Sequence, residues 1–166
     1  KSDTQLSRRR FLQRSAGLTF AGALTSQLVP SGVLAASGRL GPNDKIGIGF
    51  VAIGRQASGL LNAASRLKET RVLAFADVNV NRARAAASKY DATAYQNYHR
   101  LLERKDIDAI VTATPDHWRA LVSIHSAQAG KDIYGEKPMT LTIREGRLMV
   151  QAVRKYKRVF QTGSQQ

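Results

Sequence analysis

From residue 45 onward the chain alternates short apolar runs with longer stretches whose apolar residues fall on one helical face. The run at 45–53, KIGIGFVAI, is typical of a buried strand, and the stretch at 57–68 places its leucines on one side of a helix. The alternation continues to the end of the chain. Further strands are predicted at 71–76, 92–95, 108–113, 131–135 and 158–162, and further helices at about 80–90, 98–104, 117–129 and from 143 onward.

Strands that alternate with helices of about 10 to 15 residues form a mostly parallel sheet with helices on both faces. We therefore expect an α/β fold with a doubly wound, Rossmann-like sheet over residues 45–166. Gly130 is placed to end the helix at 117–129, and Thr142 with Glu145 forms a capping box that opens the last helix. Ligands of such sheets bind at the carboxyl ends of the strands, so the residues that follow each strand carry the functional prediction.

The turn after the first strand carries part of a phosphate-binding signature. Where the signature G-x-G-x-x-G/A has its three small residues, this chain has Ala52, Gly54 and Ala57. Gly54 lets the backbone approach a diphosphate, and the helix that starts near Ala57 directs its free amides and positive dipole end at the phosphates. Ala52 departs from the glycine of the signature. The alternative is a turn of small residues that only packs a helix on a strand.

An acidic residue ends the second strand. Asp77 follows Gly54 by 23 residues, close to the spacing of about 20 at which a carboxylate accepts hydrogen bonds from the adenosine ribose. Its negative charge repels a 2′-phosphate and favours NAD over NADP. Arg55 and Arg82 lie near enough in sequence to argue the other way. The alternative role for Asp77 is to cap the helix that follows.

Two more motifs follow the fourth and fifth strands. In TPDHW at 114–118 the proline bends the chain off the sheet, which leaves Asp116 free to cap the next helix. In GEKP at 135–138 a carboxylate and an ammonium stand beside the expected crevice. Lys137 is a candidate to hold a ribose hydroxyl, a substrate hydroxyl or a nicotinamide amide. A solvated Glu-Lys ion pair before a turn is the alternative.

As a set, Gly54 with Ala57, Asp77, the run at 106–118 and the GEKP motif resemble the Gfo/Idh/MocA oxidoreductase family. The closing segment at 159–166 is also similar to that family's crossing into a second, substrate-binding domain. The resemblance implies that Lys137 lies beside the nicotinamide and the sugar hydroxyl, that Glu136 fixes the local geometry, and that Gln165 reaches the carboxamide. The predicted cofactor-binding residues are Ala52, Gly54, Arg55, Ala57, Asp77, Thr114, Pro115, His117, Glu136, Lys137 and Gln165, with Lys137 as the catalytic residue and no metal ligand.

The same resemblance implies hydride transfer between NAD and a sugar, cyclitol or related hydroxyl compound, with NADP the less favoured cofactor. Glycoside hydrolysis through transient oxidation by bound NAD is one alternative, and a non-catalytic dinucleotide-binding module is another. Arg119 stands where relatives of this motif type commonly have histidine. We expect the chain to be cut at both ends, with the proton-transferring histidine in an absent domain, so that this fragment is inactive alone. A complete chain is expected to form a homo-oligomer.

The first 36 residues have the architecture of a signal segment. SRRRFLQ at 7–13 resembles the twin-arginine export motif, and a weakly apolar stretch follows at 16–29. That stretch is shorter and more polar than the roughly 20 residues of a membrane span, so we expect export to the periplasm through the twin-arginine machinery rather than a stable anchor. Residues 37–44 are rich in turn formers and form the expected linker.

The chain has 26 basic and 12 acidic residues, a net charge of +14, which raises the question of nucleic acid as a partner. No zinc-finger or aromatic-bearing RNA-binding motif accompanies this charge, so nucleic-acid binding is not expected. Because the chain contains no cysteine, it can hold neither a disulfide nor a thiolate zinc site.

Overall fold

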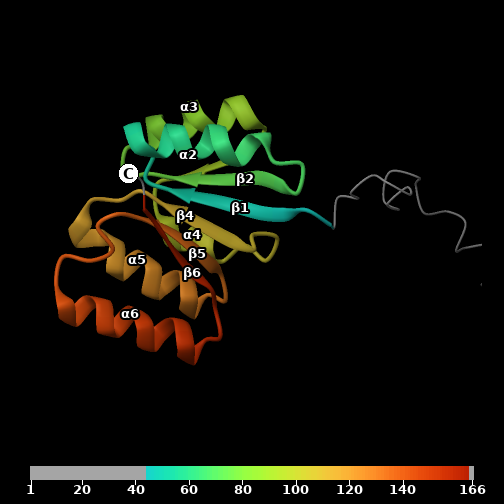
Figure 1. Ribbon diagram of the computed structural model, residues 1–166. Helices are drawn as coiled ribbons and strands as arrows, with labels where there is room; N and C mark the ends of the chain where they lie inside the picture. The colour runs from blue at the N-terminus through green and yellow to red at the C-terminus, as the bar shows by residue number, and fades with distance from the viewer. Residues whose placement is uncertain (1–43, 165–166) are drawn as a thin grey trace, which may run out of the picture. The chain divides into compact units, whose positions relative to one another are not determined.

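A computed structural model describes residues 44–164, so the signal segment, nearly all of the linker and Gln165 lie outside the described residues. Six strands alternate with five helices along this part of the chain (Figure 1). The elements are β1 (Ile46–Val51), α2 (Arg55–Arg66), β2 (Thr70–Ala76), α3 (Val80–Tyr90), β3 (Thr93–Tyr95), α4 (Tyr98–Leu102), β4 (Ala109–Thr112), α5 (Asp116–Gln128), β5 (Asp132–Glu136), α6 (Ile143–Lys155) and β6 (Phe160–Gly163).

All strand pairs are parallel, and the sheet has the order β3-β2-β1-β4-β5-β6. The chain runs outward from β1 through β2 to β3, returns to pair β4 with β1, and then runs outward on the other side. The order therefore reverses between β1 and β4, and this is the place where doubly wound sheets bind ligands. The predicted fold class is confirmed, and each predicted strand and helix is present with ends displaced by a few residues at most.

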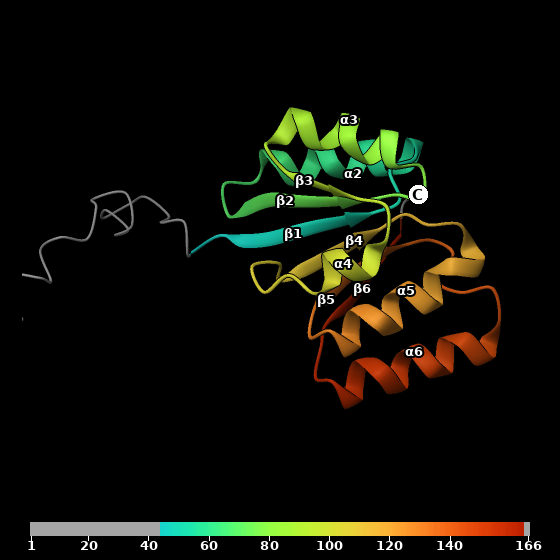
Figure 2. The same ribbon diagram turned by 180° about the vertical axis from the view of Figure 1, so that it is seen from behind.

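The two faces of the sheet are covered by different helices. In Figures 1 and 2, α2 and α3 lie on one face, and α4, α5 and α6 lie on the other. Phe50 and Phe75 pack with Leu61 of α2 and Ala83 of α3 on the first face. A second apolar cluster joins the sheet to α4 and α5, and a third lies between α5, α6 and the β5–β6 side. Because both faces are covered, β1 is an almost continuous buried run rather than an alternating one.

The helix ends predicted from the sequence are present. Thr142 Oγ1 accepts a hydrogen bond from the amide of Glu145, and the Glu145 carboxylate accepts one from the amide of Thr142, which completes the capping box. Gly130 has a φ of +76° just after α5, the left-handed conformation that ends a helix at little cost for glycine. No helix within residues 44–164 has the length and apolar character that crossing a bilayer requires.

Candidate functional site

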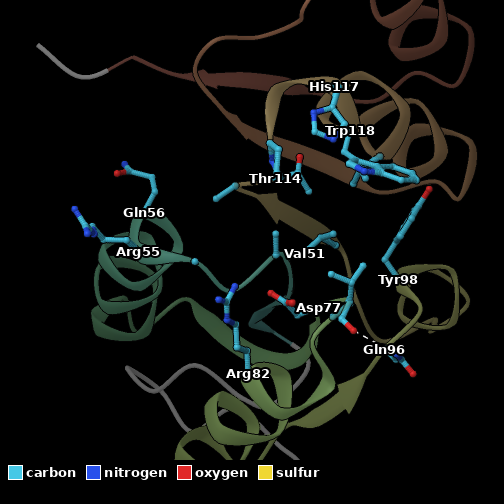
Figure 3. Close-up of a pocket in the computed structure, with 17 residues that line it drawn as sticks. Val51, Arg55, Gln56, Asp77, Arg82, Gln96, Tyr98, Thr114, His117 and Trp118 are labelled. Carbon is cyan, nitrogen blue, oxygen red and sulfur yellow. Dashed lines mark hydrogen bonds between the residues drawn. The ribbon is translucent and has the colours of Figure 1, made fainter.

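A cavity of about 550 Å³ opens at the carboxyl ends of β1, β2 and β4, where the strand order reverses (Figure 3). Four loops contribute to its walls. The lining includes Ala52, Gly54, Arg55 and Gln56 after β1, Asp77, Val78 and Arg82 after β2, Gln96 and Tyr98 after β3, and Thr114, Pro115, His117 and Trp118 after β4. Seven of the predicted cofactor-binding residues meet here: Ala52, Gly54, Arg55, Asp77, Thr114, Pro115 and His117.

The β1–α2 turn places the start of a helix at this cavity. Ala52 has a φ of +70°, the left-handed conformation that the signature normally assigns to glycine, and its amide donates a 2.8 Å hydrogen bond to the carbonyl of Ala76. Gly54 is the N-cap of α2, no side chain caps this helix, and its first turn holds no acidic residue. By contrast, side chains cap α3, α4 and α6. The start of α2 thus presents backbone amides and the positive end of a helix dipole to the cavity.

Gly54 leaves space that the protein itself does not fill. Its φ of −94° is accessible to any residue, so the backbone conformation does not require glycine. A Cβ added at this position would meet no other atom within 4 Å. Neither the conformation nor the packing of the protein explains the glycine. A close approach of a ligand to the backbone of this cavity-lining turn does, and the site therefore fits a diphosphate.

Asp77 links the turn that follows β1 to the turn that follows β2. Its Oδ2 accepts a 2.7 Å hydrogen bond from the amide of Ile53, and its Oδ1 accepts a 2.8 Å hydrogen bond from the amide of Asn79. The cap of α3 is Asn79, whose side chain accepts from the amide of Asn81, so the alternative that Asp77 is the helix cap is wrong. Two carboxylate oxygens offer about four acceptor positions, which leaves Asp77 capacity for ribose hydroxyls.

The β4–α5 turn is held by an arginine whose role the sequence left open. Arg119 is only 4% exposed, and its guanidinium donates to the carbonyls of Thr114 and Pro138. Burial lowers the pKa of Arg119 below its usual range, and the charges of Asp116 and Glu136 oppose this shift. Arg119 therefore fastens the loop that carries Thr114 to the loop that carries the Glu-Lys-Pro motif.

Asp116 does not have the capping role expected from the sequence. It is the first residue of α5, no side chain caps that helix, and its carboxylate forms a 3.5 Å ion pair with Arg119. The reason is that Pro115 itself occupies the N-cap position, so Asp116 lies in the first turn of the helix instead of the position before it. Arg119 lies one turn further along the same helix.

The Glu-Lys-Pro motif lies apart from the cavity lining. Glu136 ends β5 and is 2% exposed, so the alternative of a solvated ion pair is wrong. Its carboxylate accepts hydrogen bonds from Gln56 Nε2 at 2.9 Å and from the amide of Lys137 at 3.0 Å. Lys137 itself is exposed and is not among the lining residues. Glu136 thus supports both the start of α2 and the backbone of Lys137.

Ala57 also lies outside the cavity. It is buried at 1% exposure within α2, where its small side chain permits close packing of the helix. This is the packing role that the third small residue of the signature has. Gln165 falls outside the described residues, and its predicted contact with the carboxamide stays a prediction.

One wall of the cavity is aromatic, and the sequence did not predict it. Tyr98 and Trp118 line it, and Trp118 is 46% exposed. The Tyr98 hydroxyl lies 2.7 Å from Nδ1 of His125, and the His99 ring is 4.9 Å from that of His125. Burial raises the pKa of Tyr98; burial and, secondarily, His99 lower the pKa of His125. No signal in the sequence places these three residues together, because they come from two helices.

Within residues 44–164 no group of three or more histidine, aspartate or glutamate side chains is placed to hold a metal ion. The site instead offers the free amides at the start of α2, the carboxylate of Asp77 and an aromatic wall. A parallel sheet with this strand order and a cavity at its reversal point defines the chain as a dinucleotide-binding domain of the Rossmann type.

Comparison with known proteins agrees with this class. Residues 46–164 match the Gfo/Idh/MocA group, described as an oxidoreductase family with an NAD-binding Rossmann fold, and the chain belongs to this family. It is 30% identical over 163 residues to a glycosyl hydrolase family 109 protein of Shewanella pealeana, which covers 85% of this chain and 35% of that protein. It is 31% identical over 119 residues to an inositol 2-dehydrogenase of Salmonella typhimurium. That match covers 69% of this chain and 35% of the dehydrogenase.

Among solved structures, the fold is similar to that of the WlbA dehydrogenase of Chromobacterium violaceum in complex with NADH and UDP-GlcNAcA. The TM-score is 0.70 at 24% identity, over 74% of this chain and 36% of that one. The chain spans about a third of the length of the curated relatives that it matches.

Proposed function

We propose that this chain is the NAD-binding part of an oxidoreductase that moves a hydride between nicotinamide and a hydroxyl carbon of a sugar or cyclitol. The observation that carries the proposal is the open space at Gly54 beside the uncapped start of α2. The amides of that first turn bind the diphosphate, and Asp77 accepts hydrogen bonds from the adenosine ribose, which favours NAD. Bound nicotinamide supplies the hydride chemistry.

Lys137 is the residue that we propose for the chemical step. As an exposed ammonium at the end of β5, it is free to hydrogen-bond a substrate hydroxyl and stabilise negative charge on that oxygen as the hydride leaves. Glu136 and Arg119 fix the loop from which Lys137 projects. The base that takes the hydroxyl proton belongs, in this proposal, to a second domain, and the 166-residue chain alone does not turn over substrate.

The only tryptophan of the chain gives a direct test of cofactor binding. Trp118 lines the cavity, and its emission overlaps the absorption of reduced nicotinamide, so bound NADH quenches it. We expect saturable quenching that NAD and ADP-ribose reverse by competition. No saturation at up to about 1 mM NADH, the upper end of ordinary enzyme affinities, would refute the proposal.

A second candidate is NAD-dependent glycoside hydrolysis, which the similarity to the family 109 protein over 163 residues favours. The same cavity serves both reactions, because a hydrolase of this kind oxidises and then reduces its substrate. Net formation of NADH during turnover by the complete gene product supports the dehydrogenase. Sugar release without net NADH supports the hydrolase.

Export by the twin-arginine route and assembly into a homo-oligomer complete the proposal. The RRRF sequence at 8–11 supports the former, since that route carries folded proteins and allows a cofactor to travel inside the protein. Replacing Arg8 and Arg9 by lysine is expected to retain the protein in the cytoplasm. Unchanged periplasmic yield of this variant would refute the route.

A further inference from the structure

The outer side of α6 carries a large part of the net charge of the domain. Residues 143–158 hold six basic residues and one acidic residue, a net charge of +5, whereas residues 44–164 hold 20 and 11, a net charge of +9. More than half of the net charge therefore lies on this one helix and the turn that follows it. The basic residues of the helix itself are all exposed, and they are Arg144, Arg147, Arg154 and Lys155.

These four side chains lie on one face of α6. With 3.6 residues per turn they fall within an arc of about 100°, and Gly146, Met149 and Ala152, which are buried, lie on the opposite side. In Figures 1 and 2, α6 is the outermost helix of its layer, beyond α5. We call this arc the charged face of α6. Within residues 44–164 no other helix or strand covers it.

The charge of this face is not neutralised by the protein. Within the described part of the chain, none of its four basic residues forms an ion pair. The acidic residue of α6 is Glu145, and its carboxylate already accepts hydrogen bonds from the amides of Leu141 and Thr142 at the start of the helix. Arg144 and Arg147 are three positions apart, where like charges repel each other. A partner with spread negative charge would remove this repulsion.

Large aliphatic side chains are exposed beside the charge. Ile143, the first residue of α6, is 90% exposed, and Leu148 is 45% exposed. These two residues fall at the two edges of the charged face. Leu141, just before the helix, is 62% exposed. Aliphatic side chains gain little from the phosphate backbone of a nucleic acid, whereas basic residues flanked by aliphatic ones are typical of helices that lie on an anionic bilayer.

We propose that the charged face of α6 docks on the surface of a bilayer that contains anionic phospholipids. The guanidinium groups donate paired hydrogen bonds to headgroup phosphates, and Ile143 and Leu148 enter the boundary between headgroups and acyl chains. Such docking is peripheral and needs no membrane-spanning helix. No residue of α6 lines the dinucleotide cavity, so the docked face does not close that cavity. The inference is independent of the proposed redox function.

A fluorescent reporter on the helix tests the docking directly. Because the chain contains no cysteine, one introduced cysteine can carry an environment-sensitive fluorophore. Gln151→Cys places it within the charged face, and Asn62→Cys places it on the exposed side of α2, across the sheet from α6. With vesicles of mixed phosphatidylglycerol and phosphatidylcholine we expect stronger, blue-shifted emission at position 151 and no change at position 62. Vesicles of phosphatidylcholine alone should change neither.

The comparison of the two positions separates docking by α6 from attachment through residues 1–36. If that segment alone holds the chain on the vesicle, both reporters stay in water and their emission is unchanged. That result, or an equal change at both positions, overturns the proposal.

Neutralising the charged face tests which charges act. Three arginines of the face are replaced together, in Arg144→Gln, Arg147→Gln and Arg154→Gln. A control removes the same charge from exposed positions on α2 and α3, in Arg66→Gln, Arg84→Gln and Lys89→Gln. Each basic residue near an anionic surface contributes about fivefold to binding, so the first variant should lose at least about thirtyfold of its vesicle affinity. The control should lose less than about threefold, and equal losses would show that binding follows net charge and would overturn docking by α6.

Ile143→Ser distinguishes a bilayer from a nucleic acid. We expect vesicle affinity in cosedimentation to fall about fivefold, since the aliphatic contact with the bilayer is lost, and any binding of duplex DNA to be unchanged. Unchanged vesicle affinity, or binding of duplex DNA without binding of vesicles, overturns the proposal. Because Ile143 is 90% exposed, the substitution leaves the core intact, and thermal unfolding of every variant checks that the fold is retained.

Discussion

The side chain of Gln56 donates a 2.9 Å hydrogen bond to the buried carboxylate of Glu136, which joins the start of α2 to the end of β5 across 80 residues of sequence. Glu136 also accepts from the amide of Lys137. The phosphate-binding turn that we propose and the loop of the proposed catalytic lysine are therefore attached to the same carboxylate.

Replacing Gln56 by leucine removes this donor while nearly keeping the volume of the side chain. A buried carboxylate that loses a donor keeps its desolvation penalty, so we expect the free energy of unfolding to fall by about 1–3 kcal/mol in urea titrations. Gln151 is exposed on α6, and Gln151→Leu should change it by less than about 0.5 kcal/mol. Equal effects of the two substitutions would contradict a structural role for the Gln56 contact.

Replacing Gly54 by alanine separates binding from folding. The backbone accepts alanine and the new Cβ meets no protein atom, so we expect stability to change by less than about 1 kcal/mol. Affinity for NADH, measured by Trp118 quenching, should fall at least about tenfold because the methyl group occupies the approach to the amides. The matched control is Gly59→Ala on the exposed face of α2, which should stabilise by about 1 kcal/mol and leave affinity unchanged. Undiminished NADH binding by Gly54→Ala would count against the diphosphate position.

The left-handed backbone conformation of Ala52 lowers the stability of the fold, and glycine at this position would remove that strain. A left-handed conformation disfavours a residue with a Cβ by about 1–2 kcal/mol, partly offset by the greater entropy of unfolded glycine. Ala52→Gly should therefore raise the free energy of unfolding by about 0.5–1 kcal/mol. Ala113 lies after β4 and has no positive φ, so Ala113→Gly should lower it by about the same amount. Loss of stability in Ala52→Gly would show that the conformation of this turn is different.

Arg119→Lys tests whether the Arg119 guanidinium holds the β4–α5 loop against the loop that follows β5. A single ammonium on a flexible stem cannot reproduce the planar guanidinium fork that reaches the carbonyls of Thr114 and Pro138. We expect a loss of about 2–4 kcal/mol in chemical unfolding, since a buried cation loses part of its hydrogen bonding. Arg100→Lys alters an exposed ion pair with Glu103 and should cost less than about 0.5 kcal/mol. A cost for Arg119→Lys as small as this control would mean that the two carbonyl contacts are not needed.

His125 makes stability depend on pH on the acidic side of neutrality. Its pKa in the folded chain lies below the ordinary value of 6.5, so the unfolded chain takes up this proton first. The contribution of His125 is therefore complete above pH 6.5 and is lost as the pH falls through the lower, folded pKa. Protonated Nδ1 can only donate in its 2.7 Å contact with the Tyr98 hydroxyl, whereas the neutral ring can also accept there. Thermal unfolding of His125→Gln should show a shallower fall below pH 6.5, and identical slopes for the two proteins would contradict this.

The architecture was predictable because hydrophobic periodicity is a local property. The strand at 71–76 and the helix at 80–90 were placed within one residue of β2 and α3, and the capping box at Thr142 follows from two residues three positions apart. Gly54 and Asp77 were found because the phosphate-binding signature has fixed spacing, and the fold brings both to the same cavity.

What the sequence did not reveal depends on contacts between distant segments. The hydrogen bond between Gln56 and Glu136 and the aromatic wall of Tyr98 and Trp118 arise only when the loops meet at one edge of the sheet. Arg119 departed from the expected histidine, and only its burial shows that it links two loops. Lys137 and Ala57 were expected at the ligand, and the structure places them outside the cavity lining.

The claim that a diphosphate binds at the start of α2 is tested most directly by following the backbone amide resonances of an isotope-labelled chain during titration with NAD. The account predicts that the largest shifts occur at Gly54, Arg55, Gln56 and Ala57, with smaller shifts at Asp77. Saturable binding that leaves these four amides unmoved would contradict it.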